Sequence, residues 1–515
     1  DEGLYDEAFV KDWCVGFDEL KQRVDEYPLA RVAEITGVAE DDIAAAARMY
    51  ANADGAVIPW TPITDQQLSS TSAIRLHSIL RAVTGNLDVV GGETLGGFSE
   101  TYIPESELGL HERLPDAQKE KQLGYDDHPV FTYRVAEMLK EPTEKTWGFP
   151  YADLVMGCHM ANPTNVFRAM ATEDPYPIKA FFCLGNNALL SYANQHQIHQ
   201  AMLNQELIVS HEIFMTPTAM LADYVLPGDV FTERDHVADG WSWGTRLSLS
   251  QKVVDAPEEA SSTFQFWTDL AHRMGFGDEF PWTSLEDMLD YRLSRGGRTF
   301  AEFESATYME LAPPKFRKYR QKGFATPSGK VELASSVLAD LGFDPLPYYR
   351  ELPVQPDEFP YLVFTGVRED PFFQTGQRNI ESLRRRMPAP NLFLHPGDAQ
   401  KEGFVDGDWA KLSTPQGAVL AQVAVHDTMK ERHIRVPHGW WYPELRGEVD
   451  LAGAFISSDA VLCSDEDEWL DHEQGVPHFK GFPGKLEKAQ QPAQVSRTQP
   501  SDWRPDTAVE EHAAS

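Results

Sequence analysis

The sequence predicts an α/β protein of several domains that ends in a β-barrel, and three observations support this prediction. A chain of 515 residues is too long for a single hydrophobic core. Up to residue 344, buried-strand patterns alternate with helical ones, which is typical of open, doubly wound sheets. After the proline-rich stretch 345–360, the chain changes to short β segments separated by Gly and Asp turns.

The first part of the chain is predicted to be mainly helical. Its expected helices share apolar residues at helical spacing and lie at Leu4–Val24 (interrupted near Gly16), Ala30–Thr36, Glu40–Tyr50 and Ser72–Thr84. Between them, Ala56–Trp60 is a candidate buried strand that runs into the polar loop Thr61–Thr71. If this strand joins the sheet, the loop faces the ligand-binding edge, and Asp65, Gln66 and Gln67 are candidates to line a pocket. A solvated loop is the alternative.

A βαβ unit is predicted at Ala180–Leu184, Gln195–Leu203 and Leu207–Ser210, where two short apolar runs flank a helical stretch. Each strand runs into a polar turn, and in open α/β sheets ligands bind beyond the carboxyl ends of the strands. We therefore expect a nucleotide-like ligand there. The candidate contact residues follow the two strands and are Gly185, Asn186, Asn187, His211, Thr216 and Asp223.

Each of these candidates also has a purely structural interpretation. Gly185 lets a ligand approach the backbone, and the asparagines offer donors and acceptors, but a capped turn without a ligand fits the same residues at least as well. His211 and Thr216 are placed just past the second strand, where Thr216 followed by Pro217 also fits a helix cap. Asp223 fits either a contact to a base or the cap of a turn.

The segment after residue 360 is predicted to be an all-β module. Its expected strands are Tyr361–Gly366, Leu392–His395, Trp409–Ser413, Ala418–Val425 and Ile434–Pro437. Arg368 and Arg378, with Gln374 and Thr375 nearby, suit bidentate contacts to phosphate, and surface ion pairs are the alternative. His438 precedes three aromatic residues that either stack on a flat ligand or fill the core.

Composition argues against several classes of protein. A net charge of −35 and a pI near 4.8 argue against nucleic-acid binding, which needs clustered basic residues. The chain has no apolar run of about 18 residues, so we expect no membrane insertion, and no signal peptide is present, which leaves the cell envelope or periplasm and the cytoplasm open. Its four cysteines form no zinc-ligand pattern, and we nominate no residue as a metal ligand.

Taken together, these segments resemble the molybdopterin oxidoreductase (dimethyl sulfoxide reductase) family. The matching stretches follow the family order and are DEGLYDEAFV, LRAVTGNLDVVGG, AFFCLGNN through MTPTAMLADYVLP, GFATPSGKVEL, and TGVRED with HPGDAQKEGFVDGDW and HGWWYPE. The forms HGWWYPE and PYPIKAFFCLGNN are most similar to the branch that contains acetylene hydratase, transhydroxylases, catechol dehydroxylases, and polysulfide and thiosulfate reductases.

The resemblance implies a bis(molybdopterin guanine dinucleotide) cofactor that carries molybdenum or tungsten. It implies redox or hydration/dehydroxylation chemistry on a small substrate at the metal, with the candidates named above holding the pterin nucleotides. Trp60 joins Asp65, Gln66 and Gln67 as expected lining of the substrate pocket, and the C-terminal module becomes a six-stranded double-psi-type β-barrel. Further implied partners are an iron–sulfur electron-transfer subunit and a membrane anchor subunit.

On this basis we divide the chain into five segments. They are the C-terminal part of a first dinucleotide-binding α/β domain (1–97), a second such domain (98–344), a linker (345–360), the barrel domain (361–489) and a polar tail (490–515).

Some parts of the family pattern are not matched. The cysteine-rich [4Fe-4S] segment and the Ser, Cys or selenocysteine metal ligand are not found, so we expect them in a missing N-terminal segment or a separate chain; Cys14 lies in the wrong segment to be that ligand. Phe373 and Gln374 stand where the family has a His beside the second pterin. The alternatives are a non-catalytic pterin-nucleotide-binding fragment or subunit that needs a separate N-terminal part, and a structural subunit that binds no nucleotide.

Overall fold

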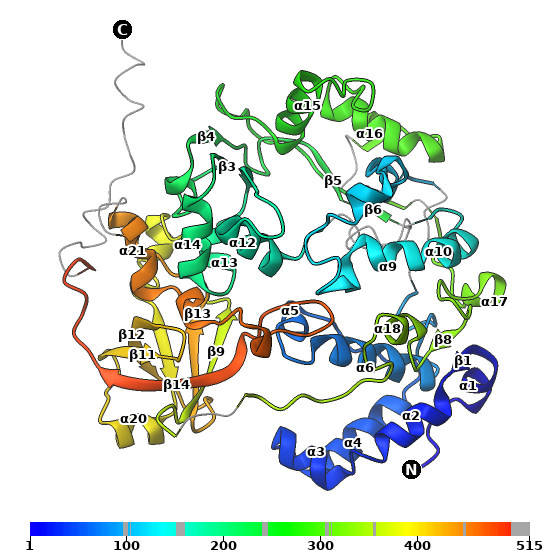
Figure 1. The fold of residues 1–515 in the computed structure, drawn as a ribbon, viewed down its shortest axis with the longest axis horizontal. Coiled ribbons are helices and arrows are strands. Elements are labelled where there is room, and N and C mark those ends of the chain that lie inside the picture. Colours follow the sequence, from blue (N-terminus) through cyan, green and yellow to red (C-terminus); the bar gives the residue numbers. More distant parts are fainter. Residues whose placement is uncertain are drawn as a thin grey trace.

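The computed structural model describes residues 1–95, 101–103, 105–150, 160–238, 246–303, 308–310, 312–353, 357–445 and 450–495. Figure 1 shows a helical N-terminal region, an α/β region and a barrel near the C-terminus. Within these ranges no helix is both long enough and apolar enough to cross a bilayer. Most of the expected polar tail, residues 496–515, lies outside the described residues.

The predicted N-terminal helices are confirmed. They are α1 (Glu7–Trp13), α2 (Phe17–Val24), α3 (Leu29–Thr36), α4 (Glu40–Ala51) and α6 (Ser70–Val83). The expected interruption near Gly16 contains a short strand, β1 (Cys14–Val15), which pairs in parallel with β8 (Val331–Glu332). Gly16 has a φ of +82°, and a Cβ at this position would lie 2.7 Å from the backbone nitrogen of Ala334. This close crossing of two chain segments therefore requires glycine.

The strand expected at Ala56–Trp60 is wrong, because the structure places no strand there. Two backbone N–H groups of this segment donate to the side chains of Asn86 and Glu93, at 2.9 and 3.0 Å, instead of to a neighbouring strand. Val57 and Trp60 are 56% and 53% exposed, so the apolar run is not buried either. A short apolar run predicts burial only when the fold supplies a partner strand, and the described residues supply none here.

The βαβ unit is confirmed as part of a three-stranded parallel sheet in the order β2-β3-β4. Strand β2 (Ala180–Leu184) and helix α14 (Gln195–Leu203) have the predicted bounds, and β3 (Leu207–Glu212) extends two residues further. Sequence reasoning missed β4 (Tyr224–Pro227). Helices α12 (Pro163–Thr172) and α13 (Ala188–Ser191) contribute buried apolar residues to the same core as this sheet.

A second, antiparallel sheet is formed by β5 (His236–Ala238), β6 (Arg246–Ser250) and β7 (Tyr308–Glu310). Two longer helices follow in this region, α15 (Thr263–Arg273) and α16 (Leu285–Leu293). The remaining short helices outside the barrel are α7 (Glu105–Leu108), α8 (Asp116–Lys119), α9 (Tyr133–Met138), α10 (Lys140–Trp147), α17 (Tyr319–Lys322) and α18 (Ser336–Asp340).

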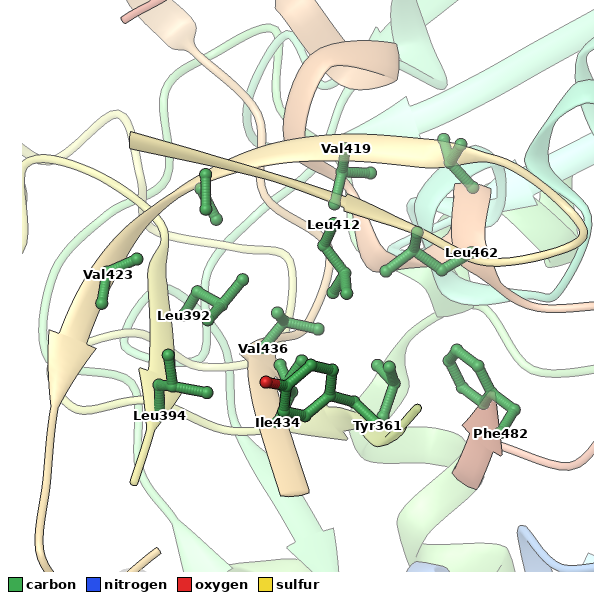
Figure 2. Close-up of a cluster of buried hydrophobic side chains, with 14 of the residues drawn as sticks. Tyr361, Leu392, Leu394, Leu412, Val419, Val423, Ile434, Val436, Leu462 and Phe482 are labelled. Atoms are coloured by element: carbon green, nitrogen blue, oxygen red, sulfur yellow. The ribbon is translucent and has the colours of Figure 1, made fainter. Parts of the chain in front are cut away.

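The C-terminal module is a closed six-stranded barrel with the order β10-β12-β11-β14-β9-β13. Its strands are β9 (Tyr361–Val367), β10 (Asn391–Leu394), β11 (Trp409–Ser413), β12 (Ala418–Val425), β13 (His433–Pro437) and β14 (Lys480–Lys488), with helices α19 (Glu381–Arg384), α20 (Pro396–Glu402) and α21 (Asp450–Ser457) beside them. Figure 2 shows the barrel core, in which Leu392, Leu412, Ile434 and Val436 are buried. Alternate residues of β10 and β12 are buried in this core, as pleated strands require.

Strand β14 was missed by sequence reasoning because its sequence, KGFPGKLEK, contains two glycines, a proline and three lysines. Such a sequence is unusual for a strand paired on both sides. The glycine at position 484 has a structural reason. A Cβ there would lie only 2.4 Å from Val363 Cγ2 of the neighbouring strand. The strand lies across the front of the barrel in Figure 1 and closes it between β11 and β9.

A buried pair of carboxylates connects the segment before β14 to the N-terminal helices. Asp471 accepts hydrogen bonds from the backbone N–H and hydroxyl of Thr71, at 2.9 and 2.8 Å, and from the backbone N–H groups of Glu473 and Gln474, at 3.1 and 3.0 Å. Glu473 Oε1 accepts a hydrogen bond of 3.0 Å from the hydroxyl of Tyr348. Burial, and after it the nearby Asp471 carboxylate, together raise the pKa of the Glu473 carboxyl to about 7.

This raised pKa predicts a pH-dependent loss of stability that Glu473→Gln removes. Between the ordinary pKa of 4.5 and about 7, the folded protein holds a proton that the unfolded chain has lost, so this group stabilises the fold below pH 4.5 and loses that contribution as pH rises through 7. We therefore compare the free energy of unfolding of Glu473→Gln with that of the wild type. The variant minus wild-type difference is expected to be about 2 kcal/mol larger at pH 8 than at pH 5. Urea unfolding at both values measures it, with Glu431→Gln, which is 74% exposed, as the control. An equal difference at both pH values contradicts the prediction.

Candidate functional site

Polar turns follow the parallel strands at one edge of the β2-β3-β4 sheet. Leu184 is aligned with His211 of β3, and His211 with Leu226 of β4, so the carboxyl ends of all three strands meet there. Gly185 continues the alignment, because its N–H donates to the carbonyl of His211 at 2.9 Å. Gly185 has a φ of +58° and no atom within 4 Å of the position of a Cβ, so the space beside it is open. The structure thus places this predicted residue where a ligand can approach the backbone.

Asn187 is the buried member of the Gly185-Asn186-Asn187 turn. Its Oδ1 accepts hydrogen bonds from the N–H and hydroxyl of Thr218, at 3.2 and 2.7 Å, which ties the β2 turn to the β3 turn. Its Nδ2 is buried and has no hydrogen-bond partner among the described residues. Asn186 is exposed, and its side-chain amide lies 3.4 Å from the hydroxyl of Tyr192. A buried donor without an acceptor costs free energy, so Asn187 fits a site that receives an acceptor from a ligand.

Three other predicted contact residues have structural partners. His211 was expected just past the second strand, but it lies inside β3. Its Nε2 is 2.9 Å from the carbonyl oxygen of Ser261. The expectation was wrong because the polar pair at the strand end still forms ladder hydrogen bonds with β4. Thr216 Oγ1 accepts from the N–H of Ala219 at 3.2 Å, which is the predicted capping alternative. Asp223 is exposed, and its Oδ2 accepts from the N–H of Ile208 at 2.7 Å.

The barrel loop brings three of its predicted residues together. Arg378 donates to the carbonyl oxygens of Gln374 and His438, at 2.7 and 2.5 Å. Thr375 lies against the same turn, since a Cβ on Gly439 would lie 2.3 Å from Thr375 Cγ2. Gln374 has a φ of +51°, which is uncommon for a residue other than glycine. The structure therefore joins Gln374, Thr375 and Arg378 to His438 at the end of β13.

Arg368 stands apart from this group. Its guanidinium lies 4.9 Å from the ring centroid of Phe373, which is exposed. Phe373 and Gln374 thus differ in environment, with Phe373 turned to solvent beside Arg368. The described contact of Arg368 is that of a cation on an aromatic ring.

Arg378 is a buried cation without a carboxylate in ion-pair distance among the described residues. Its guanidinium lies 5.0 Å from the ring of Phe372 and 5.1 Å from that of Trp440, and its Nε has no hydrogen-bond partner among the described residues. Burial, and after it the neighbouring Arg384, together lower the pKa of Arg378 to about 9. Arg384 itself pairs with Glu444 at 2.9 Å. An anion next to Arg378 would offset the cost of this uncompensated charge.

Asp459, which sequence reasoning missed, connects the ends of two barrel strands. Gly366 at the end of β9 and His438 and Gly439 after β13 form this end of the barrel, which we call the barrel mouth. Asp459 Oδ2 accepts from Gly366 N–H at 2.9 Å and lies 3.1 Å from His438 Nδ1, and its Oδ1 accepts from Gly439 N–H at 2.7 Å. Burial alone raises the pKa of Asp459, but His438 and the two backbone donors more than offset it, so the pKa is lowered. The available signal was a lone carboxylate within the apolar run AFISSDAVLC, because a charge in such a run is buried only when it has partners.

The loop after Trp60 reaches the barrel mouth and not the edge of the β2-β3-β4 sheet. The segment Thr61–Thr71 was predicted as a loop, but it contains a short helix, α5 (Pro62–Asp65). Gln66 is the member that contacts the barrel, since its carbonyl accepts from Phe479 N–H at 3.1 Å. Its Oε1 lies 3.3 Å from the position of a Cβ on Gly366, and Lys480 Nζ lies 2.8 Å from the same position. Gln66 and Lys480, another residue that sequence reasoning missed, therefore meet over Gly366.

The other three loop candidates are held less tightly. Trp60 Nε1 donates to Asp65 Oδ1 at 3.2 Å, and burial raises the pKa of the Asp65 carboxyl despite this bond. Gln67 Nε2 donates back to the carbonyl of Ile63 at 3.1 Å, within the loop itself. Trp60 and Asp65 thus form a local pair, and Gln67 supports the turn.

Trp441 connects the sheet edge to the barrel loop. Its Nε1 donates to the carbonyl of Thr375 at 2.8 Å, and its ring is buried in one core with Leu189 and Leu190 of α13. The turn that carries Asn187 and the loop that carries Arg378 are therefore fixed to one side chain. Both contribute buried N–H donors without acceptors among the described residues, and Arg378 adds positive charge. This donor set fits a nucleotide-bearing ligand, whose phosphates and base supply acceptors.

Comparison with known proteins identifies the family. Residues 136–273 match the family described as Molybdopterin oxidoreductase, and residues 362–482 match the Molydopterin dinucleotide binding domain. The chain is 45% identical over 499 residues to acetylene hydratase of Syntrophotalea acetylenica, covering 95% of this chain and 68% of that protein. It is 24% identical over 446 residues to the thiosulfate reductase molybdopterin-containing subunit of Salmonella typhimurium, covering 80% and 56%.

The fold agrees with these sequence matches. The solved structure of acetylene hydratase from Pelobacter acetylenicus matches with a TM-score of 0.90 and 43% identity, over 95% of this chain and 68% of that one. The chain therefore spans about two thirds of the length of the hydratase, and residues 362–482 of this chain supply a domain for a molybdopterin cofactor. This chain belongs to the molybdopterin oxidoreductase family.

Proposed function

We propose that this chain is the cofactor-binding portion of an enzyme that holds molybdenum or tungsten on two molybdopterin guanine dinucleotides. The observation that carries the proposal is the pair of buried donor sets, Asn187 at the sheet edge and Arg378 in the barrel loop, both fixed to Trp441. One set is available for each of two nucleotides. The similarity to acetylene hydratase favours hydration of a small unsaturated substrate over net electron transfer.

The chain's own residues would bind and orient the cofactor. In this proposal Gly185, Asn186 and Asn187 receive one nucleotide at the carboxyl ends of the strands, where Gly185 leaves room and Asn187 Nδ2 donates. Arg378 and Thr375 receive the other, and Arg378 supplies the charge that a phosphate requires. The bound group supplies a metal centre that polarises or oxidises the substrate.

The residues at the barrel mouth would control the surroundings of that centre. Asp459 holds His438 through Nδ1, which leaves Nε2 as the atom that can face a ligand. Gln66 and Lys480 meet over Gly366 beside this pair. We propose that the Trp60–Asp65 pair lines the substrate side, where burial raises the pKa of the Asp65 carboxyl above its ordinary value.

Replacing Arg378 tests the cofactor assignment directly. Arg378→Met removes the uncompensated cation and keeps an unbranched apolar stem, so we expect bound guanine nucleotide per chain to fall at least about tenfold. Nucleotide released by acid and metal measured by mass spectrometry give the readout on anaerobically purified protein. The matched control is Arg385→Met, because Arg385 directly follows helix α19 and its side chain is 64% exposed. Equal nucleotide content in Arg378→Met and wild type would sink the assignment.

A further inference from the structure

A small cavity lies beside the barrel, apart from the residues assigned to the cofactor. It has a volume of about 120 Å³. Its walls come from the turn between β11 and β12, the segment after Leu462 and the start of β14, and its lining residues include Thr414, Gln416, Ser464, Trp469, His478 and Phe482. None of these residues belongs to the Asn187 turn, the Arg378 loop or the Asp459 cluster. A cavity near about 150 Å³ accepts a benzene-sized molecule, so this one suits a single functional group.

His478 is the unexplained polar group in this cavity. His478 is only 5% exposed, and neither ring nitrogen has a hydrogen bond of good geometry among the described residues; the backbone of Gly481 lies near enough to the ring to act on its pKa, in the raising direction. The ring stacks on Trp469, with centroids 5.9 Å apart and an interplanar angle of 28°. Burial lowers the pKa of His478 to about 4, so at neutral pH the ring is uncharged and presents one acceptor nitrogen and one N–H donor. A buried polar group in this state calls for a ligand or an ordered water.

The charged side chains around the cavity indicate which charge a ligand would carry. Two exposed residues of the acidic run Asp465–Glu468, namely Glu466 and Glu468, line the cavity. Arg168 pairs with Asp465 and Asp467, at 3.8 and 2.9 Å, while Glu466 and Glu468 have no ion-pair partner among the described residues. Arg350 donates to the carbonyls of Glu468 and Leu470, at 3.4 and 2.6 Å, and the positive charges of Lys480 and Arg350 both contribute to lowering the pKa of His478. The two free carboxylates belong to the cavity lining, so they favour a cation there.

We propose that this cavity binds a guanidinium group. A guanidinium is planar and carries five N–H donors, so it can donate to the acceptor nitrogen of His478 and to Glu466 and Glu468 at once. It also packs well on aromatic surface such as Trp469 and Phe482. The group arrives either on a small free molecule or on an arginine side chain of a second polypeptide. The site is independent of the cofactor and of the proposed reaction.

Titration of the purified full chain with methylguanidinium tests the proposal by ligand-observed NMR. We expect saturable binding, with the uncharged isostere methylurea at least about tenfold weaker. The double variant Glu466→Gln/Glu468→Gln alters only exposed side chains and is expected to weaken binding about tenfold. His478→Phe keeps a ring on Trp469, removes both nitrogens and is expected to abolish binding. The control is Glu431→Gln, which is exposed and does not line the cavity.

The two sources of the group are separated by a second arm. Arginine amide and a short peptide with one arginine are compared with the same peptide carrying citrulline. Binding of the peptide at least about tenfold more tightly than arginine amide assigns the site to a polypeptide partner, and similar binding of both assigns it to a free molecule. Equal binding of methylurea and methylguanidinium, unchanged binding in the glutamine double variant, or no saturable binding overturns the proposal, and the cavity then holds water only.

Discussion

Asp459→Ala is expected to release the cofactor and to destabilise the barrel domain. Three donors would lose their acceptor: the buried N–H group of Gly439, and the half-buried N–H group of Gly366 and Nδ1 of His438. Each unsatisfied buried donor costs about 1–3 kcal/mol, so the total loss in unfolding free energy is expected to be about 3 kcal/mol or more. The turns that carry His438 and Gly366 would then separate, and the barrel half of the cofactor site would lose its shape. Differential scanning calorimetry and guanine nucleotide content measure the two effects.

Asp459→Asn separates the charge from the shape of this side chain. Asparagine offers one oxygen, so it can satisfy Gly366 or Gly439 but places an NH2 group against the other. We expect an intermediate loss of stability and a loss of nucleotide close to that of Asp459→Ala. Asp427→Asn is the control, because the Asp427 side chain is 90% exposed. Normal stability and full nucleotide content in Asp459→Ala would show that the barrel mouth does not depend on this carboxylate.

Asp471→Ala is expected to separate the C-terminal segment from the N-terminal helices. Asp471 is fully buried and accepts from Thr71 twice and from the N–H groups of Glu473 and Gln474. Removing it leaves these donors without an acceptor, and we expect a loss of about 3 kcal/mol or more. The loss is local to this junction, so hydrogen exchange by mass spectrometry on peptides covering residues 69–74 and 470–476 is the measurement.

The exchange pattern distinguishes this prediction from general destabilisation. Peptides at the junction should lose protection, while those from the core of the β2-β3-β4 sheet keep it. Asp467→Ala is the matched control, because its side chain is 83% exposed and its bond to Arg168 is a surface ion pair. Uniform loss of protection over the whole chain, or unchanged protection at residues 69–74, would contradict a local role for Asp471.

The strands with regular patterns were predictable from sequence. Ala180–Leu184, Trp409–Ser413 and Ala418–Val425 have the predicted bounds, because a short apolar or alternating run between turn residues determines such a strand locally. The candidate turn Gly185–Asn187 follows from the same logic, since the end of a parallel strand is where ligands bind. The expected domain boundaries stay predictions.

The errors occurred where a distant segment decides the outcome. Ala56–Trp60 has the composition of a buried strand but uses Asn86 and Glu93 as its hydrogen-bond partners. Strand β14 has the composition of a loop but is held between β11 and β9. In both cases the local sequence carries no information about the partner, and β pairing depends on it.

The sequence by itself determined the family, the βαβ unit, the barrel and the residues that lie at the strand ends. Only the tertiary structure showed that Asp459 joins Gly366 to Gly439 and that Trp441 fixes the Arg378 loop to the core of α13. The physical reason is that secondary structure follows from periodicity over a few residues, whereas a buried charge acquires its role from partners far away in the chain. The site is therefore predictable as a set of turns, and its working geometry is a property of the folded protein.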